Sequence, residues 1–315
     1  MISPNLKTEK NLRVLFNNFK NESVYSSRLS KETIRGYVNS FILFEKIMPE
    51  IDTTDLLSQS ALTEFFKRLE TRGRKVGKGE IKTGVKKSTI RTYWAKLNVF
   101  FKWLEKKQYI EINPLEDIRP PRVSYDDYKR LEDEEINKIY SAIVRSEKSF
   151  MLRRDTMMVS LFVYLGIRRT EFISIQIKDL DLEKKQIIIK GETSKSKKTR
   201  ALPIHPTLLM HIKDYLEERN KLGYKSEYLI LSSRRDFRLT LDGLKHWVNK
   251  VIKISGVKFN VHRFRHTYAC KIIEGHTPTA SLQKLLGHSS LTMTEQYTRS
   301  LRPEDMAGEV GKISF

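Results

Sequence analysis

Cysteine is almost absent from this sequence. Cys270 is the single cysteine among 315 residues, so one chain can form neither an internal disulfide framework nor a cysteine-based zinc cluster. Long apolar runs are also missing: none could span a membrane, and no hydrophobic segment precedes a small-residue cleavage site near the N-terminus. We therefore expect a cytoplasmic protein of a reducing compartment, with no membrane partner.

Acidic residues are too few to balance the basic ones. Lys and Arg total 59 against 38 Asp and Glu, which gives a formal net charge of +21 and a pI near 9.8. An excess of this size indicates a polyanionic partner, with nucleic acid foremost.

The length of the chain suits two domains, each with its own core. Residues 1–118 predict a small helical domain, because apolar residues recur at three- and four-residue steps after possible N-cap residues Ser30 and Ser88. Prolines disfavour helix around the following segment, which predicts a linker at 119–130. Residues 131–315 form the second predicted domain.

The second domain begins with the segment "LEDEEINKIYSAI", whose acidic first turn suits the positive end of a helix dipole. Two β-rich runs, "QIIIK" and "TRALPI", lie on either side of a polar turn. Further helical segments follow. The expected fold is mainly α with a small antiparallel β-sheet, an α+β arrangement.

Residues 72–87 combine four glycines with seven Lys or Arg residues and a single Glu. This composition disfavours regular structure, so we expect a mobile basic loop. Two interpretations stay open, a solvated connector or a contact with the DNA backbone. The second would use Arg72, Arg74, Lys75 and Lys78.

Three short motifs carry residues suited to phosphate chemistry. In "GIRRTE", Arg168 and Glu171 are three residues apart, and in "VHRFRHTYAC" the same spacing separates His262 from Arg265. On a helix, residues at this spacing share a face, so His262 and Arg265 could donate to one phosphate. Arg168 and Glu171 taken alone also fit an ordinary surface ion pair.

The third motif is "LLGHSSLTMTEQYTRS", which contains His288 after a glycine turn and Tyr297 nine positions later. A tyrosine hydroxyl has a pKa of about 10, so it attacks poorly unless cations stabilise the charge that develops. The arginines and histidines of the other motifs could provide those cations.

Together these motifs resemble the tyrosine recombinases, the superfamily of phage integrases and Xer-like proteins. The segments "GIRRTE", "TSKSKKTRALPI", "HRFRHTYA" and "LLGH", followed by a tyrosine, occur in the order of that family. The resemblance implies an N-terminal helical core-binding domain and a C-terminal catalytic domain, both on DNA. It also implies a site-specific recombinase that works without metal or cofactor.

The resemblance assigns a role to each matching residue. Arg168 and Arg265 would hold the scissile phosphate, Lys195 would protonate the leaving 5′ oxygen, and Tyr297 would form a 3′-phosphotyrosyl bond. His262 would accept a proton or donate to the phosphate, and His288 would hold a phosphate oxygen. Glu171 would orient Arg168 or other donors of the site without being catalytic. Because Lys197 and Lys198 crowd the turn of Lys195, they are alternatives for the acid, and otherwise belong to a solvated or DNA-binding basic hairpin.

The resemblance further implies duplex DNA with paired inverted core half-sites, a homotetramer on synapsed DNA and a monomer when free. Two other functions remain open at this stage: a type IB topoisomerase, which uses a similar residue set on one duplex, and a DNA-binding regulator without activity. These residues do not determine the target sequence, its spacer or any accessory proteins. They also leave open the biological task and whether the tail after Tyr297 is exchanged between protomers.

Overall fold

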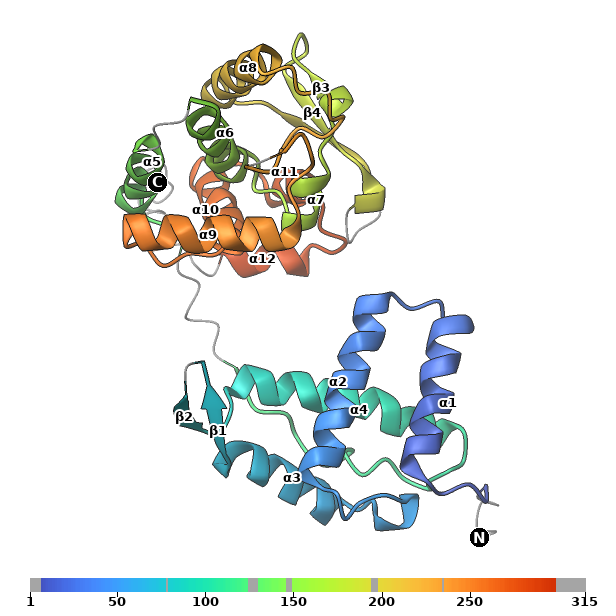
Figure 1. Ribbon diagram of the computed structural model, residues 1–315. Helices are drawn as coiled ribbons and strands as arrows, with labels where there is room; N and C mark the ends of the chain where they lie inside the picture. Colours follow the sequence, from blue (N-terminus) through green and yellow to red (C-terminus); the bar gives the residue numbers. More distant parts are fainter. Residues whose placement is uncertain are drawn as a thin grey trace, which may run out of the picture. The chain divides into compact units, whose positions relative to one another are not determined.

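The computed structural model describes residues 7–77, 79–123, 130–145, 149–193, 198–233 and 235–298. The chain divides into two compact units, Met1–Tyr125 and Asp126–Phe315. Both are rich in helix, and each contains one small antiparallel sheet (Figure 1). The predicted fold, mainly helical with a small antiparallel sheet, is confirmed. In the described ranges, the helices are too short or too polar to cross a membrane.

The first unit packs its helices around a core of aromatic rings. Phe16 stacks on Phe41 with ring centroids 4.0 Å apart, and Phe100 meets both rings edge-on. Burial of these large apolar side chains is what holds the helices together. The elements of this unit are α1 (Leu12–Tyr25), α2 (Lys31–Ile47), the 3-10 helix η1 (Thr54–Leu56), α3 (Gln59–Thr71), β1 (Gly73–Val76), β2 (Glu80–Thr83) and α4 (Lys87–Lys106).

The basic segment 72–87 is not the irregular loop that its composition predicts. β1 and β2 pair as an antiparallel hairpin in which Val76 lies opposite Glu80. Gly77 and Gly79 both have positive φ, 58° and 108°, a conformation that glycine adopts without steric cost and that a short hairpin loop needs. The glycines therefore close a turn between the basic strand β1 and β2.

The second unit surrounds α6 with other helices. α6 packs against α5, α8 and α10 (Figure 1). The three-stranded sheet has the order β3-β4-β5, with Ile187 opposite Leu202. Its elements are α5 (Asp133–Val144), α6 (Ser149–Leu165), α7 (Arg169–Ser174), η2 (Ile177–Asp179), β3 (Leu180–Asp181), β4 (Gln186–Ile189), η3 (Gly191–Thr193), β5 (Arg200–Pro203), α8 (Pro206–Lys221), α9 (Leu241–Ser255), α10 (Val261–Glu274), α11 (Thr279–Leu286) and α12 (Thr292–Thr298).

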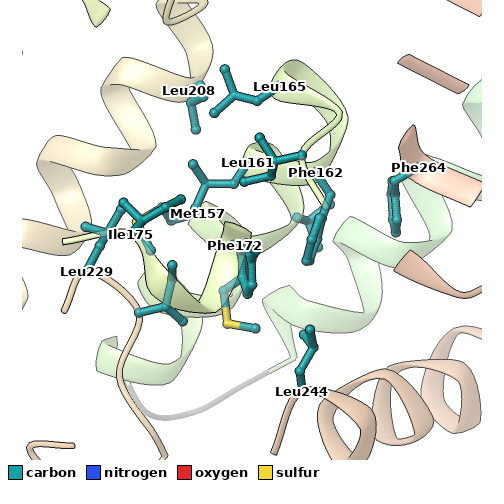
Figure 2. Close-up of a cluster of buried hydrophobic side chains, with 14 of the residues drawn as sticks. Met157, Leu161, Phe162, Leu165, Phe172, Ile175, Leu208, Leu229, Leu244 and Phe264 are labelled. Carbon is teal, nitrogen blue, oxygen red and sulfur yellow. The ribbon is translucent and has the colours of Figure 1, made fainter. Parts of the chain in front are cut away.

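Three phenylalanines of this core fix the backbone next to the predicted catalytic residues. Phe162 of α6 stacks on Phe172 of α7 at 4.2 Å and on Phe264 of α10 at 5.9 Å between centroids. Figure 2 shows the three rings among the labelled side chains of this core. Phe172 follows Glu171, and Phe264 precedes Arg265. Burial of the rings therefore fixes the backbone positions of Glu171 and Arg265.

Candidate active site

Glu171 is buried between two arginines. Its carboxylate accepts hydrogen bonds from Nη1 of Arg168 at 2.9 Å and from Nη1 and Nη2 of Arg200 at 3.1 and 2.9 Å. It also accepts from the backbone N–H of Arg168, the N-cap of α7. Burial raises the pKa of Glu171, but the hydrogen bonds and charges of the arginines outweigh it and lower that pKa to about 2. Glu171 is therefore ionised at neutral pH.

The C-terminal end of α11 binds three arginines on three successive carbonyl oxygens. The carbonyl of Leu285 accepts from Nε of Arg200 at 2.9 Å, and that of Leu286 from Nη2 of Arg265 at 2.7 Å. The carbonyl of Gly287 accepts from Nη2 of Arg168 at 3.2 Å. The last carbonyls of a helix lack partners within it and lie at its negative end. This end therefore gathers guanidiniums from α7, β5 and α10.

Position 287 requires glycine. Gly287 ends α11 in the left-handed conformation, with φ of 64°, which favours glycine. A Cβ at this position would lie 2.9 Å from Nη1 of Arg200. The "LLGH" motif thus supplies both the carbonyl oxygens and the room that Arg200 needs.

Arg265 is held rigidly in the interior. Only 2% of the residue is exposed, and besides Leu286 it donates to the carbonyl of Gly166 at 2.7 Å and contacts Nε2 of His288 at 3.0 Å. These bonds use three of the five N–H groups of a guanidinium. Burial and the charge of Arg168 lower the pKa of Arg265 to about 10, so Arg265 still carries its charge at neutral pH.

His288 is neutral in this arrangement. Arginine can only donate, so Nε2 of His288 accepts from Arg265, and Nδ1 must then carry the proton and donate to Oγ1 of Thr294 at 2.9 Å. Burial, followed by the charges of Arg265 and Arg168, lowers the pKa of His288 to about 4. The ring is thus fixed in one tautomer beside two cations.

Tyr297 lies between two histidine rings. Its ring is parallel to that of His288, with centroids 5.9 Å apart and an interplanar angle of 11°. The ring of His266 meets it edge-on at 5.0 Å. Tyr297 is 1% exposed and belongs to a small apolar cluster with Leu282 and Leu286. The hydroxyl-bearing side chain is therefore brought to the arginine cluster, within the same chain.

His262 lies in the first turn of α10, three residues before Arg265, as its spacing predicts. The residue is exposed. Loss of hydration, followed by the charges of Arg265 and Arg168, lowers the pKa of His262, as expected for a residue one helical turn from Arg265. The structure thus gathers Arg168, Glu171, His262, Arg265, His288 and Tyr297 around the end of α11.

Of the remaining predicted residues, those within the described ranges have no contact with this cluster, and the others lie outside those ranges. Lys78, Lys195 and Lys197 are outside the described residues, as is the tail after 298. Lys198 is exposed, and Lys75 is exposed on β1. Arg72 caps the end of α3, and Nε of Arg74 donates to the carbonyl of Gly84 at 2.7 Å.

Sequence reasoning missed two residues of this cluster, Arg200 and His266. Arg200 opens the run "RALPI", which was expected only to form a strand, and His266 follows Arg265 directly. A signal existed for Arg200: a charged residue at the start of an otherwise apolar strand, next to the lysine-rich turn, needs a partner if it is buried. The partner, Glu171, is 29 positions away in sequence.

Comparison with known proteins extends the similarity over both units. Residues 129–303 match the phage integrase family. The tyrosine recombinase XerA of Thermococcus onnurineus is 35% identical over 186 residues, which cover 58% of this chain and 62% of that protein. The tyrosine recombinase XerC of Thermodesulfovibrio yellowstonii is 28% identical over 298 residues, 91% of this chain and 92% of the relative.

Solved structures have the same fold. The Tn1549 transposon integrase in complex with a circular intermediate DNA matches with a TM-score of 0.77 at 17% identity, over 97% of this chain and 100% of that one. The XerH site-specific recombinase bound to a palindromic difH substrate matches with a TM-score of 0.70 at 22% identity, over 89% and 79%. The segment matched by the family contains the whole cluster from Arg168 to Tyr297, and the chain belongs to the phage integrase family of tyrosine recombinases, enzymes that cleave and rejoin DNA strands.

Proposed function

We propose that this recombinase cleaves duplex DNA by attack of the Tyr297 hydroxyl oxygen on a backbone phosphate. A bond forms between that oxygen and phosphorus, the bond from phosphorus to the 5′ oxygen breaks, and a 3′-phosphotyrosyl linkage remains beside a free 5′ hydroxyl. The observation that carries this proposal is a chain of contacts: Tyr297 stacks on His288, and His288 accepts a hydrogen bond from Arg265.

The arginines supply the positive charge that the reaction needs. Arg168 and Arg200 share one buried carboxylate, Glu171, and Arg265 is held at the same end of α11, so a net positive charge is left for a phosphate. Fixed charges in a site shielded from water stabilise a transition state strongly, because they need no rearrangement as charge develops. We assign Arg168 and Arg265 to the two non-bridging oxygens, with Glu171 orienting Arg168.

The histidines and a lysine complete the proton transfers. Burial, followed by the charges of the arginines, lowers the pKa of His262 and of His288 in the free protein. A bound phosphate offsets the charges of the arginines and raises both pKa values. Each ring can then donate to a phosphate oxygen or take the tyrosine proton. We assign protonation of the leaving 5′ oxygen to Lys195, with Lys197 and Lys198 as the alternatives.

The phosphotyrosyl bond explains how strands are rejoined. It conserves the energy of the broken linkage, so the 5′ hydroxyl of a partner strand can reverse the attack without a nucleotide cofactor. Because Tyr297 is 1% exposed, a phosphate can reach its oxygen only after Tyr297 or the side chains that cover it move. We therefore infer that binding of DNA uncovers Tyr297 before cleavage.

We further propose that residues 1–118 form a core-binding domain, joined by the linker 119–130 to the catalytic domain 131–315. The β1–β2 hairpin would contact the DNA backbone through Arg72, Arg74, Lys75 and Lys78, since neutralising phosphates is the general source of affinity for DNA. The XerH complex contains a palindromic substrate, which supports paired inverted half-sites here, bound by a homotetramer that assembles from monomers on DNA.

Trapping of the covalent intermediate tests the chemistry. Fragmented DNA from the source of the gene, incubated with the protein and then denatured, should yield a protein-bound fraction whose ends map the cleavage sites. Tyr297→Phe should abolish it, because the ring still fills the space between His266 and His288 while the hydroxyl is lost. Tyr25→Phe, at an exposed tyrosine of α1, is the matched control. An adduct that persists in Tyr297→Phe would place the nucleophile elsewhere.

The recombinase and integrase relatives favour strand exchange over a type IB topoisomerase or an inactive regulator. Plasmids that carry one mapped site or two separate these functions. A recombinase exchanges strands between the sites of a plasmid that carries two. A topoisomerase relaxes the plasmid with one site as completely as the plasmid with two. A regulator would bind both plasmids and form no adduct.

A further inference from the structure

Arg200 is a buried charged residue to which the proposed chemistry assigns no step. It is the first residue of β5, and its side chain is 9% exposed. Its Nη1 and Nη2 form a two-pronged bond to the Glu171 carboxylate, and its Nε donates to the carbonyl of Leu285. One side chain thus connects β5 to α7 and to α11.

We propose that Arg200 is a positioning residue for DNA cleavage, which keeps Glu171 in place without letting that carboxylate neutralise Arg168. The inference rests on the proposed function, because it concerns how Arg168 is presented to the phosphate. Arg200 itself touches neither the phosphate nor Tyr297 in this proposal.

The charges explain why a second arginine is required. Glu171 bonds Arg168 through both its side chain and its backbone N–H, and it fixes the start of α7. A carboxylate with Arg168 as its single partner would form a neutral pair, and would repel a phosphate brought to that pair. With Arg200 on its other side, Glu171 shares its charge between two guanidiniums, and a positive charge remains at Arg168.

The geometry explains why the residue is arginine. Three N–H groups of Arg200 point at three different acceptor atoms, the two oxygens of Glu171 and the carbonyl of Leu285. A planar guanidinium can satisfy all three at once, whereas a lysine ammonium on its flexible stem cannot hold that fork. Gly287 leaves room for the guanidinium, since a Cβ there would lie 2.9 Å from its Nη1.

Arg200 also holds the start of β5 in place. Just before it, Oγ1 of Thr199 accepts a hydrogen bond from the N–H of Gly191 at 3.0 Å. Arg200 follows directly and is bonded to Leu285 and Glu171. The same arginine therefore holds the start of β5 against both α7 and α11, beside Arg168.

Single-turnover cleavage of a nicked DNA site tests the proposal, with protein in excess over DNA. Arg200→Ala should cleave roughly tenfold to hundredfold more slowly, as expected for the loss of hydrogen bonds to a charged group, while its dissociation constant for DNA changes by less than about threefold. Arg200→Lys should recover part of the rate. Wild-type rates in Arg200→Ala would overturn the proposal.

A double variant separates positioning from a merely structural role. If Arg200 acts through Glu171, then Glu171→Gln should offset part of the loss in Arg200→Ala, because the amide carries no charge that needs a second cation. Losses that multiply in the double variant would contradict the inference. Relative to the wild type, the rate of Arg200→Ala should also recover toward acidic pH, since its Glu171 takes up a proton more readily and then no longer neutralises Arg168; an unchanged pH profile would count against the inference.

Arg154 provides a matched control. It is another buried arginine, bonded to the Asp155 carboxylate and to the carbonyl of Leu231, away from the end of α11. Arg154→Ala should lower the melting temperature and leave the cleavage rate of the folded protein unchanged. If Arg200→Ala does not fold, Arg200→Lys and Arg200→Gln are compared in the same way. Absence of any adduct in the wild type would instead refute the proposed function.

Discussion

Replacement of Gly287 by alanine tests whether the end of α11 holds the site together. The residue has φ of 64°, and an added Cβ would lie 2.9 Å from Nη1 and 3.1 Å from Cζ of Arg200. That guanidinium is no free end, because Glu171 and Leu285 bind it on two sides. Alanine at 287 must therefore strain the backbone and displace Arg200.

The magnitude follows from these two effects. A left-handed conformation costs a residue with a Cβ about 1 to 2 kcal/mol, and loss of a hydrogen bond to a charged group costs about 1.5 to 3 kcal/mol. We expect Gly287→Ala to lower the free energy of unfolding by roughly 2.5 to 5 kcal/mol. Since the carbonyl of Gly287 also holds Arg168, cleavage should slow by about a hundredfold.

Gly256 supplies the control. It ends α9 with φ of 71°, and among the described parts of the chain a Cβ there would meet no atom within 4 Å. Gly256→Ala should lose only the backbone part, about 1 to 2 kcal/mol, and cleave at the wild-type rate. Urea unfolding and single-turnover cleavage measure both variants. Equal stability and equal cleavage rates for Gly287→Ala and Gly256→Ala would refute the reasoning.

Three further outcomes are expected. Arg265→Ala should cleave at least tenfold more slowly than Arg265→Lys, because alanine removes both the charge and the fork; wild-type cleavage by the alanine variant would remove Arg265 from the site. Burial lowers the pKa of His266 and of His288 to about 4, so the unfolded chain takes up protons first as pH falls. Stability should therefore decrease between about pH 6.5 and pH 4, by roughly 1 to 3 kcal/mol for each histidine once solvent screening is allowed for, and urea midpoints that do not change over this range would contradict it. Arg74→Gln and Lys75→Gln should each weaken DNA binding and reduce its salt dependence by about one ion; fluorescence anisotropy at several salt concentrations measures this, and unchanged slopes would exclude a backbone contact by the hairpin.

Much of the helical framework could be predicted from local signals. The hydroxyl of Ser30 accepts a hydrogen bond from the backbone N–H of Thr33 and caps α2, as expected, and the acidic start of α5 lies at Asp133. At α4 the helix begins at Lys87 with Lys86 as its N-cap, two positions before the expected N-cap Ser88. Helix ends are the least certain part of such predictions, because neighbouring polar residues compete for the same cap.

The site was predictable only in part. The order and spacing of the motifs group Arg168, Arg265 and Tyr297 into one site. Spacing cannot show, however, which partner a buried charged side chain has. The partner of Glu171 across the fold, Arg200, becomes visible only when β5 and α7 are packed together. Likewise, no local signal shows that Tyr297 is covered by two histidine rings, because His266 reaches it from another helix.

The hairpin at 73–83 was missed for a different reason. Its glycines and lysines are individually poor strand formers, and together they are typical of irregular chain. Two glycines with positive φ nevertheless close the turn, and the pairing follows from their position. Composition describes the average behaviour of a segment, whereas a turn depends on particular residues.

The last turn of α11 binds three guanidiniums, so insertions or deletions in this turn should not be tolerated. Each residue added to a helix rotates the later residues by about 100° around its axis, so an insertion within 285–288 would turn all three carbonyl oxygens away from their donors at once. An insertion at 275–278, before α11 begins, leaves that register intact. Related proteins that differ in length should therefore gain or lose residues ahead of this helix and keep its last turn unaltered.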